Sequence, residues 1–249
     1  EEGTLASLHE GEGRLPDIQT IMNNIRSMFE PFLPLKGKRV LVTAGPTREA
    51  IDPVRFISNR SSGKMGYALA ECARDMGATI ILVSGPVALP DIPEVKIVKV
   101  ESAKEMECAV LRNCSKADYI FMAAAVADYM PTKISEKKIK RRNEILNLNL
   151  FPTPDILKSI QNKTKAIITA FALETHNGEQ EAKRKMREKN TDFIVLNYAN
   201  EQGAGFNSNT NHVTIFNKKG ISKELKKDRK DRIAKKIIEH IIISKINHK

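Results

Sequence analysis

The order in which short apolar runs and helical patterns alternate most constrains the fold of this chain. The segments expected to form buried strands are 40–42, 79–83 and 119–127, and 95–100 alternates apolar and charged residues, as an outer strand does. Apolar residues recur every three or four positions over 64–76, and a capping box, Ser102 and Glu105, opens the helix after 95–100. Strands and helices in this order predict an α/β fold with a doubly wound, mainly parallel, Rossmann-like sheet.

The alternation is interrupted once, over 130–151. There "KISEKKIKRRNEILNLNLF" alternates apolar and polar residues at period two, which indicates a β-hairpin flap instead of a crossover helix. After it we expect helices over 153–162, 178–190 and 228–245, and strands over 166–171, 192–196 and 212–216. The basic stretch "KELKKDRKDRIAKK" carries acids as well, and we interpret it as the solvated face of the last helix.

Composition narrows the class of protein. The 249 residues and 41% apolar content support an independent core, and the absence of 18 consecutive apolar residues predicts no transmembrane helix. A net charge of +11 indicates an anionic partner, which could be a nucleic acid, a nucleotide, a phosphorylated metabolite or a membrane surface. The three cysteines lack metal-binding spacing and are expected to be buried thiols, and the scattered histidines suggest no zinc site.

Domain boundaries are expected near residue 37. Residues 1–36 are rich in Gly and Pro and resemble a linker, whereas 37–249 carry the α/β pattern. The first residue is not Met, so we expect the sequence to be part of a longer chain.

Ligands of an open parallel sheet bind beyond the carboxyl ends of its strands. The loops expected there are 43–66, 124–130, 171–178 and 197–211. The first is unusually long, and it includes "SNRSSGKMG" directly before a helix. Helix N–H groups and the dipole favour an anion at this point, although a simple turn capped by Ser61 or Ser62 is the alternative.

Three further stretches carry charge or small residues. "KKIKRR", 137–142, could close over a polyphosphate, but charge alone favours an exposed face or a nucleic-acid arm. "AAAVADY", 123–129, could let a ligand approach the backbone or could be a tightly packed strand end. Lys185 and Lys189 share one helical face, for which an exposed basic surface is the simpler interpretation.

Taken together, these motifs resemble one enzyme family. "VLVTAGPTREAIDPVRFISNRSSGKMG", "AAAVADY", "EKKIKRR", "PTPDIL", "AFALET" and "GFNSNTN" are similar to the bacterial, CTP-dependent phosphopantothenate–cysteine ligase, the ligase half of the bifunctional phosphopantothenoylcysteine decarboxylase/phosphopantothenate–cysteine ligase. The resemblance covers about 37–245. It also implies that 1–36 include the remnant of a preceding decarboxylase domain.

The resemblance implies a reaction of coenzyme A biosynthesis. The ligase would join 4′-phosphopantothenate to L-cysteine through an acyl-cytidylate formed from CTP, with Mg²⁺, in a cytoplasmic homodimer whose flaps mediate dimerisation. FMN would be needed only if the decarboxylase half is present in the parent chain. Neither nucleic acid nor membrane is an expected partner.

Site residues follow from the same resemblance. Asn59 would hold the acyl-nucleotide intermediate, with Arg55 as its neighbour and the Ala124 backbone against the ligand. Lys138 would act in the nucleotidyl-transfer step, and no metal ligand is identified. The nucleotide-binding set would be Asp128, Lys138, Pro154, Asp155, Ile156, Leu157, Phe171, Lys185 and Lys189, and the anion site expected at the helix start adds Ser61 and Gly63.

Two other classes fit less well. A nicotinamide-dependent dehydrogenase needs G-x-G-x-x-G after the first strand, where this chain has "TAGPTRE". A nucleic-acid-binding module would need aromatic residues for base stacking, and aromatics are only 5% of the chain.

Overall fold

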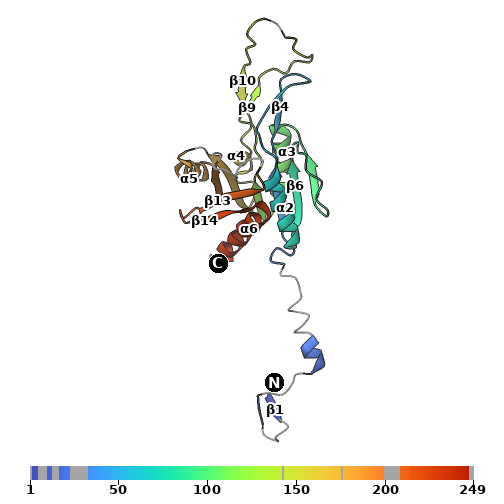
Figure 1. Ribbon diagram of the computed structural model, residues 1–249, viewed down its shortest axis with the longest axis vertical. Coiled ribbons are helices and arrows are strands. Elements are labelled where there is room, and N and C mark those ends of the chain that lie inside the picture. Colours follow the sequence, from blue (N-terminus) through green and yellow to red (C-terminus); the bar gives the residue numbers. More distant parts are fainter. Residues whose placement is uncertain are drawn as a thin grey trace. The chain divides into compact units, whose positions relative to one another are not determined.

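The protein is described here by a computed structural model (Figure 1). It describes residues 2–4, 10–12, 17–22, 33–141, 143–174, 176–198 and 208–246. The chain divides into two compact units, Glu1–Pro34 and Leu35–Lys249. In the first unit β1 (Glu2–Thr4) pairs antiparallel with β2 (Glu10–Glu12), and residues 18–22 are helical.

The second unit is built on one eight-stranded sheet with the order β14-β13-β12-β11-β8-β3-β6-β7. Its strands are β3 (Arg39–Ala44), β6 (Thr79–Ser84), β7 (Lys96–Lys99), β8 (Tyr119–Met122), β11 (Ile167–Glu174), β12 (Phe193–Tyr198), β13 (Thr210–Asn217) and β14 (Ser222–Arg229). The six strands from β12 to β7 are parallel, and β13 and β14 extend the sheet antiparallel at one edge. The expectation of a mainly parallel α/β sheet is therefore confirmed.

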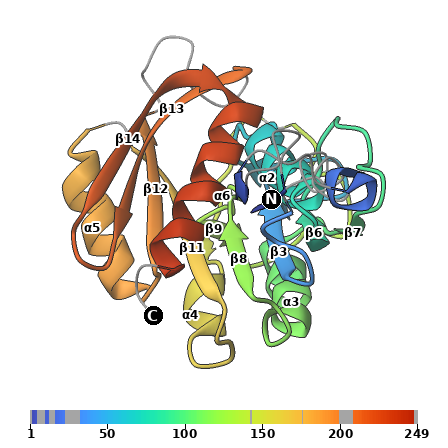
Figure 2. The same cartoon turned by 90° about the horizontal axis from the view of Figure 1, so that it is seen from below.

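Helices cover both faces of this sheet (Figure 2). They are α2 (Lys64–Asp75), α3 (Ala103–Cys114), α4 (Ile156–Ile160), α5 (Gly178–Glu188) and α6 (Lys230–Ile246). α2 and α6 pack together over one face, and α3, α4 and α5 cover the other. The core is mainly aliphatic: Val42 of β3, Leu69 of α2 and Ile237 of α6 are fully buried where the helices cover the sheet.

Helix ends follow local chemistry. The predicted capping box is present, since the Glu105 N–H donates to Ser102 Oγ at 3.2 Å. The second hydrogen bond of a capping box would run from the Ser102 N–H to the Glu105 carboxylate. Here the N–H of the preceding residue, Glu101, donates to Glu105 Oε2 at 2.8 Å instead. α2 ends beside Gly77, whose φ of 91° is the left-handed conformation expected of a terminating glycine.

Two short hairpins rise from the carboxyl edge of the sheet. β4 (Arg48–Ala50) pairs with β5 (Phe56–Ser58), and β9 (Tyr129–Pro131) pairs with β10 (Leu150–Pro152). Figure 1 shows β4 beside β9 and β10, with a long loop beyond them. We call the segment 129–152 the flap. The pairing expected across it is confined to its base, because described residues between 132 and 149 form no strand.

Three further expectations differ from the structure. The run 119–127 is a strand only as far as Met122, and residues 123–127 are irregular. The helix expected over 153–162 is reduced to α4. Residues 222–229, interpreted as a helix face, form β14, an edge strand in which Leu225 is the buried apolar residue. Its lysines suit a solvated sheet edge, so a charge pattern typical of helices also fits this strand.

Candidate functional site

The strand order places a crossover point next to β3. The chain leaves β3 for β6 and β7 on one side, and it then returns to β8 on the other side. In open parallel sheets, the crevice at the carboxyl ends of two such strands is where ligands bind. At this position the chain has Gly45 after β3 and the small residues 123–127 after β8.

Asn59 holds the strand end that follows β8. Its Nδ2 donates to the carbonyl oxygens of Ala125 at 3.2 Å and Val126 at 2.9 Å. The side chain is exposed, but it reaches across the crevice from the loop after β5 to the loop after β8. Asn59 therefore sets the backbone of residues 125 and 126 at the crossover point.

Three threonines hold the same segment from other sides. Thr43 Oγ1 accepts from the Ala124 N–H at 3.2 Å, and Thr47 Oγ1 accepts from the Ala127 N–H at 3.0 Å. Thr153 Oγ1 donates to the Ala127 carbonyl oxygen at 2.5 Å. Sequence reasoning gave none of the three a role, although two of them stand in the motif "VTAGPT".

The start of α2 requires a glycine. Gly63 occupies the N-cap position with φ 77°, and no side chain caps the helix. A Cβ at Gly63 would lie 2.6 Å from Val87 Cγ1. Ser61 accepts from the Gly63 N–H at 3.3 Å, so it forms the turn before the helix and is not the N-cap of the alternative interpretation.

A cavity of about 300 Å³ opens beside the crevice, between the ends of β8 and β11 and the start of α4. It is lined by Met122, Ala124, Val126, Ala127, Asp128, Thr153, Pro154, Asp155, Ile156, Leu157, Ala170, Phe171 and Lys189. We call it the α4 cavity. Eight residues expected from the sequence to contact ligand are thus brought together: Ala124, Asp128, Pro154, Asp155, Ile156, Leu157, Phe171 and Lys189.

The cations beside the α4 cavity are paired with carboxylates. Lys189 Nζ forms a short contact with Asp155 Oδ2, and Asp155 also caps α4 by accepting from the Lys158 N–H at 3.2 Å. Lys185 is bound to Glu174 Oε1 at 2.6 Å and does not line the cavity. A ligand entering here meets ammonium groups that are already oriented and largely neutralised.

Arg55 and Lys138 lie apart from the α4 cavity's lining. Arg55 Nη1 donates to Asp52 Oδ2 at 3.0 Å and to the Ile139 carbonyl oxygen of the flap at 2.9 Å. Lys138 stands next to that contact with an exposed side chain. Burial raises the pKa of the Asp52 carboxyl, but the N–H donors of Val54, Ile139 and Arg55 and the Arg55 charge together bring it below the ordinary 3.8.

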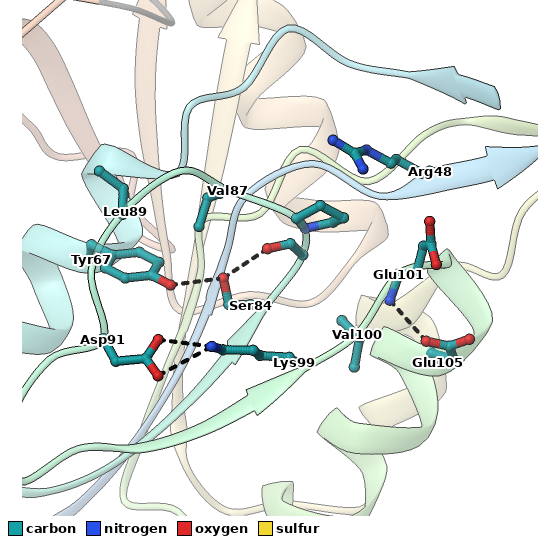
Figure 3. Close-up of a pocket in the computed structure, with 12 residues that line it drawn as sticks. Arg48, Tyr67, Ser84, Val87, Leu89, Asp91, Lys99, Val100, Glu101 and Glu105 are labelled. Carbon is teal, nitrogen blue, oxygen red and sulfur yellow. Dashed lines mark hydrogen bonds and ion pairs between the residues drawn. The ribbon is translucent and has the colours of Figure 1, made fainter. Parts of the chain in front are cut away.

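A second cavity, of about 460 Å³, lies at the ends of β6 and β7 (Figure 3). Sequence reasoning did not anticipate it. Lys99 pairs with Asp91 at 3.0 Å across it, and Tyr67 OH lies 3.2 Å from Ser84 Oγ. Figure 3 shows Arg48 on the far side from that ion pair, and its guanidinium lies 4.5 Å from the centre of the Phe56 ring.

Metal, thiol and membrane features are limited in the described residues. They contain no group of three or more His, Cys, Asp or Glu arranged to hold a metal ion. Burial raises the pKa of the Cys72 thiol to about 11, so it stays protonated near neutral pH. Within the described part of the chain, none of the helices is both long and apolar enough to cross a membrane.

The loop expected over 197–211 is partly outside the described residues, which omit 199–207 and with them the start of "GFNSNTN". Arg142 of the basic flap motif and Thr175 of "AFALET" also lie outside them. Asn209 is described, and its Oδ1 accepts from Lys64 Nζ at 2.7 Å.

Comparison with known proteins relates nearly the whole second unit to one family. The family model described as DNA/pantothenate metabolism flavoprotein C-terminal domain matches residues 35–244. The coenzyme A biosynthesis bifunctional protein CoaBC of Bacillus subtilis is 46% identical over 90% of this chain and 56% of its own length. A protein named cysteine/cysteine sulfinic acid decarboxylase, from an unknown prokaryotic organism, is 42% identical over 96% of this chain and 69% of its own.

Solved structures agree on the fold. The crystal structure of the C-terminal domain of a CoaBC protein superposes with a TM-score of 0.74 at 42% identity, covering 86% of this chain and 99% of that one. A DNA/pantothenate metabolism flavoprotein from Streptococcus pneumoniae has a TM-score of 0.70 at 21% identity, covering 82% of this chain and 98% of that one, and at that identity it supports the fold alone.

The names of these relatives do not support the ligase activity that was expected from the resemblance. They include flavoprotein and decarboxylase, and none of those given above contains ligase, CTP or magnesium. The identification as a CTP-dependent phosphopantothenate–cysteine ligase, and the expectations of CTP and Mg²⁺, are therefore withdrawn. What stands is the context of coenzyme A biosynthesis and pantothenate, in bifunctional proteins of which this chain spans little more than half.

The flavin implied by the family description does not fit either of these two cavities. Its ring system needs a wide, mainly apolar slot. The larger cavity is lined by five charged side chains, Arg48, Asp91, Lys99, Glu101 and Glu105. The α4 cavity is small and offers one aromatic ring, Phe171. Neither cavity is lined by a Cys or His. We therefore assign neither FMN nor decarboxylase chemistry to these residues.

The family itself rests on the match over 35–244 and on relatives above 40% identity. The protein belongs to the family described as the DNA/pantothenate metabolism flavoprotein C-terminal domain.

Proposed function

We propose that this chain binds a phosphorylated derivative of pantothenate in coenzyme A biosynthesis, at the crevice between β3 and β8. The observation that carries the proposal is the pair of hydrogen bonds from Asn59 to the carbonyl oxygens of Ala125 and Val126, directly beside the α4 cavity. The pathway comes from the names of relatives that are 38–46% identical to this chain.

The geometry favours a small, elongated acid. The alanines after β8 leave the backbone open to close approach, and Asn59, Thr43 and Thr47 hold that backbone in one conformation. Cationic groups stand on two sides, with Arg55 and Lys138 towards the flap and Lys189 in the cavity. A phosphate and a more distant amide or carboxylate could be held at the two ends of such a site.

The site residues expected from the sequence enter this proposal in two groups. Asn59, Arg55, Ala124, Lys138, Ser61 and Gly63 would contact the ligand along the crevice. Asp128, Pro154, Asp155, Ile156, Leu157, Phe171 and Lys189 would line its second part, with Lys185 close by. The supporting observation is that the second group lines one cavity, apart from Lys185.

The flap supports a homodimer. Large apolar side chains are exposed on the two neighbouring hairpins: Val54, Phe56, Tyr129, Ile134, Ile145, Leu146, Leu148, Leu150 and Phe151. Ile145 is 90% exposed, and exposed apolar side chains that gather on neighbouring segments are typical of protein interfaces. We propose that a second copy covers these hairpins. We also propose that the protein is a cytoplasmic enzyme. A preceding domain would be fused to residues 37–249 through residues 1–36.

Isothermal titration calorimetry tests the binding proposal. We expect the chain to bind 4′-phosphopantothenate or its cysteine adduct, and to bind unphosphorylated pantothenate at least tenfold more weakly, because a charge-assisted contact to phosphate is lost. Lys138→Gln should weaken binding. Lys165→Gln, an exposed lysine at the opposite edge of the sheet, should not. Equal affinities for pantothenate and both phosphorylated compounds would contradict the proposal.

A further inference from the structure

The flap is tied to the body of the protein at one buried carboxylate. Asp52 is 2% exposed and lies in the turn between β4 and β5. Its two oxygens have different partners. Oδ1 accepts from the N–H groups of Val54 and Arg55 at 2.8 and 2.9 Å, which closes the turn. Oδ2 accepts from the Ile139 N–H at 3.1 Å, which belongs to the flap.

Arg55 completes the same contact. Its Nη1 donates both to Asp52 Oδ2 at 3.0 Å and to the Ile139 carbonyl oxygen at 2.9 Å. Both backbone groups of Ile139 are thus satisfied by one ion pair. Nearer the base of the flap, the Ser135 N–H donates to the Ile51 carbonyl oxygen at 3.0 Å. The flap is therefore bonded to the β4–β5 turn at two points four residues apart.

The residue fixed by this ion pair stands between two lysines. Lys138 and Lys140 flank Ile139, and both side chains are exposed. The described flap residues between β9 and β10 form no strand that could hold them by a regular ladder. The backbone from which these two side chains extend is consequently held at Ile139, by Asp52 and Arg55.

We infer that Asp52 is a positioning residue, whose carboxylate acts with Arg55 to fix the flap backbone at Ile139 and thereby to present Lys138 to the ligand. The part that concerns ligand binding rests on the proposed function, whereas fixation of the flap does not.

Limited trypsin digestion of the full chain measures the fixation directly. Lys137, Lys138 and Lys140 are trypsin sites within the flap, and cleavage requires the segment to detach from the body. Asp52→Asn places an amide donor opposite the Ile139 N–H and removes the charge that orients Arg55. When opening is fast relative to cleavage, the rate follows the open population, so we expect cleavage after Lys138 to rise about tenfold.

The controls separate this effect from general destabilisation. Asp91→Asn neutralises a carboxylate that pairs with Lys99 away from the flap, and it should leave the flap cleavage rate unchanged. Arg55→Lys keeps the charge and shortens the donor, and it should speed flap cleavage like Asp52→Asn. Thermal melts check that each variant is folded, and mass spectrometry identifies the bond cleaved.

A double-mutant cycle tests the effect on Lys138. Asp52→Asn and Lys138→Gln should each lower the affinity for the phosphorylated ligand, and the double variant should lose little more than the larger single loss. Unchanged flap cleavage in folded Asp52→Asn would overturn the inference. Fully additive affinity losses would overturn the positioning of Lys138. Should the unaltered chain bind neither phosphorylated compound, the proposed function fails and the cleavage rates alone decide on the fixation.

Discussion

Replacing Asn59 by Asp changes one amide for a carboxylate of the same shape at the crossover point. The Nδ2 group that donates to the carbonyl oxygens of Ala125 and Val126 becomes an oxygen facing two oxygens. Two lost hydrogen bonds at about 1 kcal/mol each destabilise the bound arrangement of this backbone by about 2 kcal/mol, before any repulsion is counted. We therefore expect the affinity for 4′-phosphopantothenate to fall about thirtyfold or more.

Calorimetric titration measures this loss, and amide hydrogen exchange locates it. Exchange at residues 124–127 should accelerate in the variant. The melting temperature should hardly change, because Asn59 is exposed and lies outside the core. Asn113→Asp is a matched control, since its Nδ2 donates to the Ala109 carbonyl oxygen at 2.7 Å on α3. An Asn59→Asp chain with unchanged affinity and unchanged exchange would refute the role given to this side chain.

Three further predictions concern Gly63 at the start of α2, the buried Lys230, and the binding of flavin. Gly63→Ala should lower the free energy of unfolding, measured with urea, by about 1–3 kcal/mol, because φ is 77° and the new Cβ would clash with Val87. Adding Val87→Ala should remove the clash and restore part of this loss, while the backbone strain remains. Burial and the charge of Lys64 lower the pKa of Lys230 from 10.5 to about 8. Between those values the folded state binds fewer protons than the unfolded state, so stability should rise with pH across that window. Chemical denaturation of Lys230→Met should show no such rise, and a gain in stability at pH 7 of at most about 3 kcal/mol. The purified chain, mixed with FMN and desalted, should retain no visible flavin absorbance, since neither cavity at the carboxyl edge offers a suitable slot; stoichiometric retention would show that the residues fit a flavin after all.

The sheet was predictable because its strands are buried on both faces. Val40–Val42 and 79–83 are continuous apolar runs, and such runs in an α/β order leave few alternative topologies. β14 was not predictable in the same way. Only Leu225 of its eight residues is buried among apolar neighbours, so its sequence carries almost no period-two signal. Its strand conformation comes from pairing with β13, which is a tertiary effect.

The candidate site was predictable in part. The residues of "AAAVADY" and "PTPDIL" meet in the α4 cavity because the first segment follows β8 and the second leads from the base of the flap into α4. Asp52 lies in the long loop 43–66, and its sequence context gave it no role. Its function as an acceptor for the flap depends on the return of the chain 87 residues later, which no local pattern reveals. The second cavity was missed for the same reason, since Arg48 and Glu105 come together only in the fold.

The net charge of +11 points to an anionic partner, but several cations at the candidate site are already paired with carboxylates. Lys189 is paired with Asp155, Lys185 with Glu174 and Arg55 with Asp52. An anion gains little from a cation that already has a carboxylate, because it must share or displace that partner. Lys138 and its basic neighbours on the flap have exposed side chains and supply the charge that remains for a ligand. Affinity should therefore depend on where the flap is held, which makes the contact at Ile139 more important to binding than the overall charge.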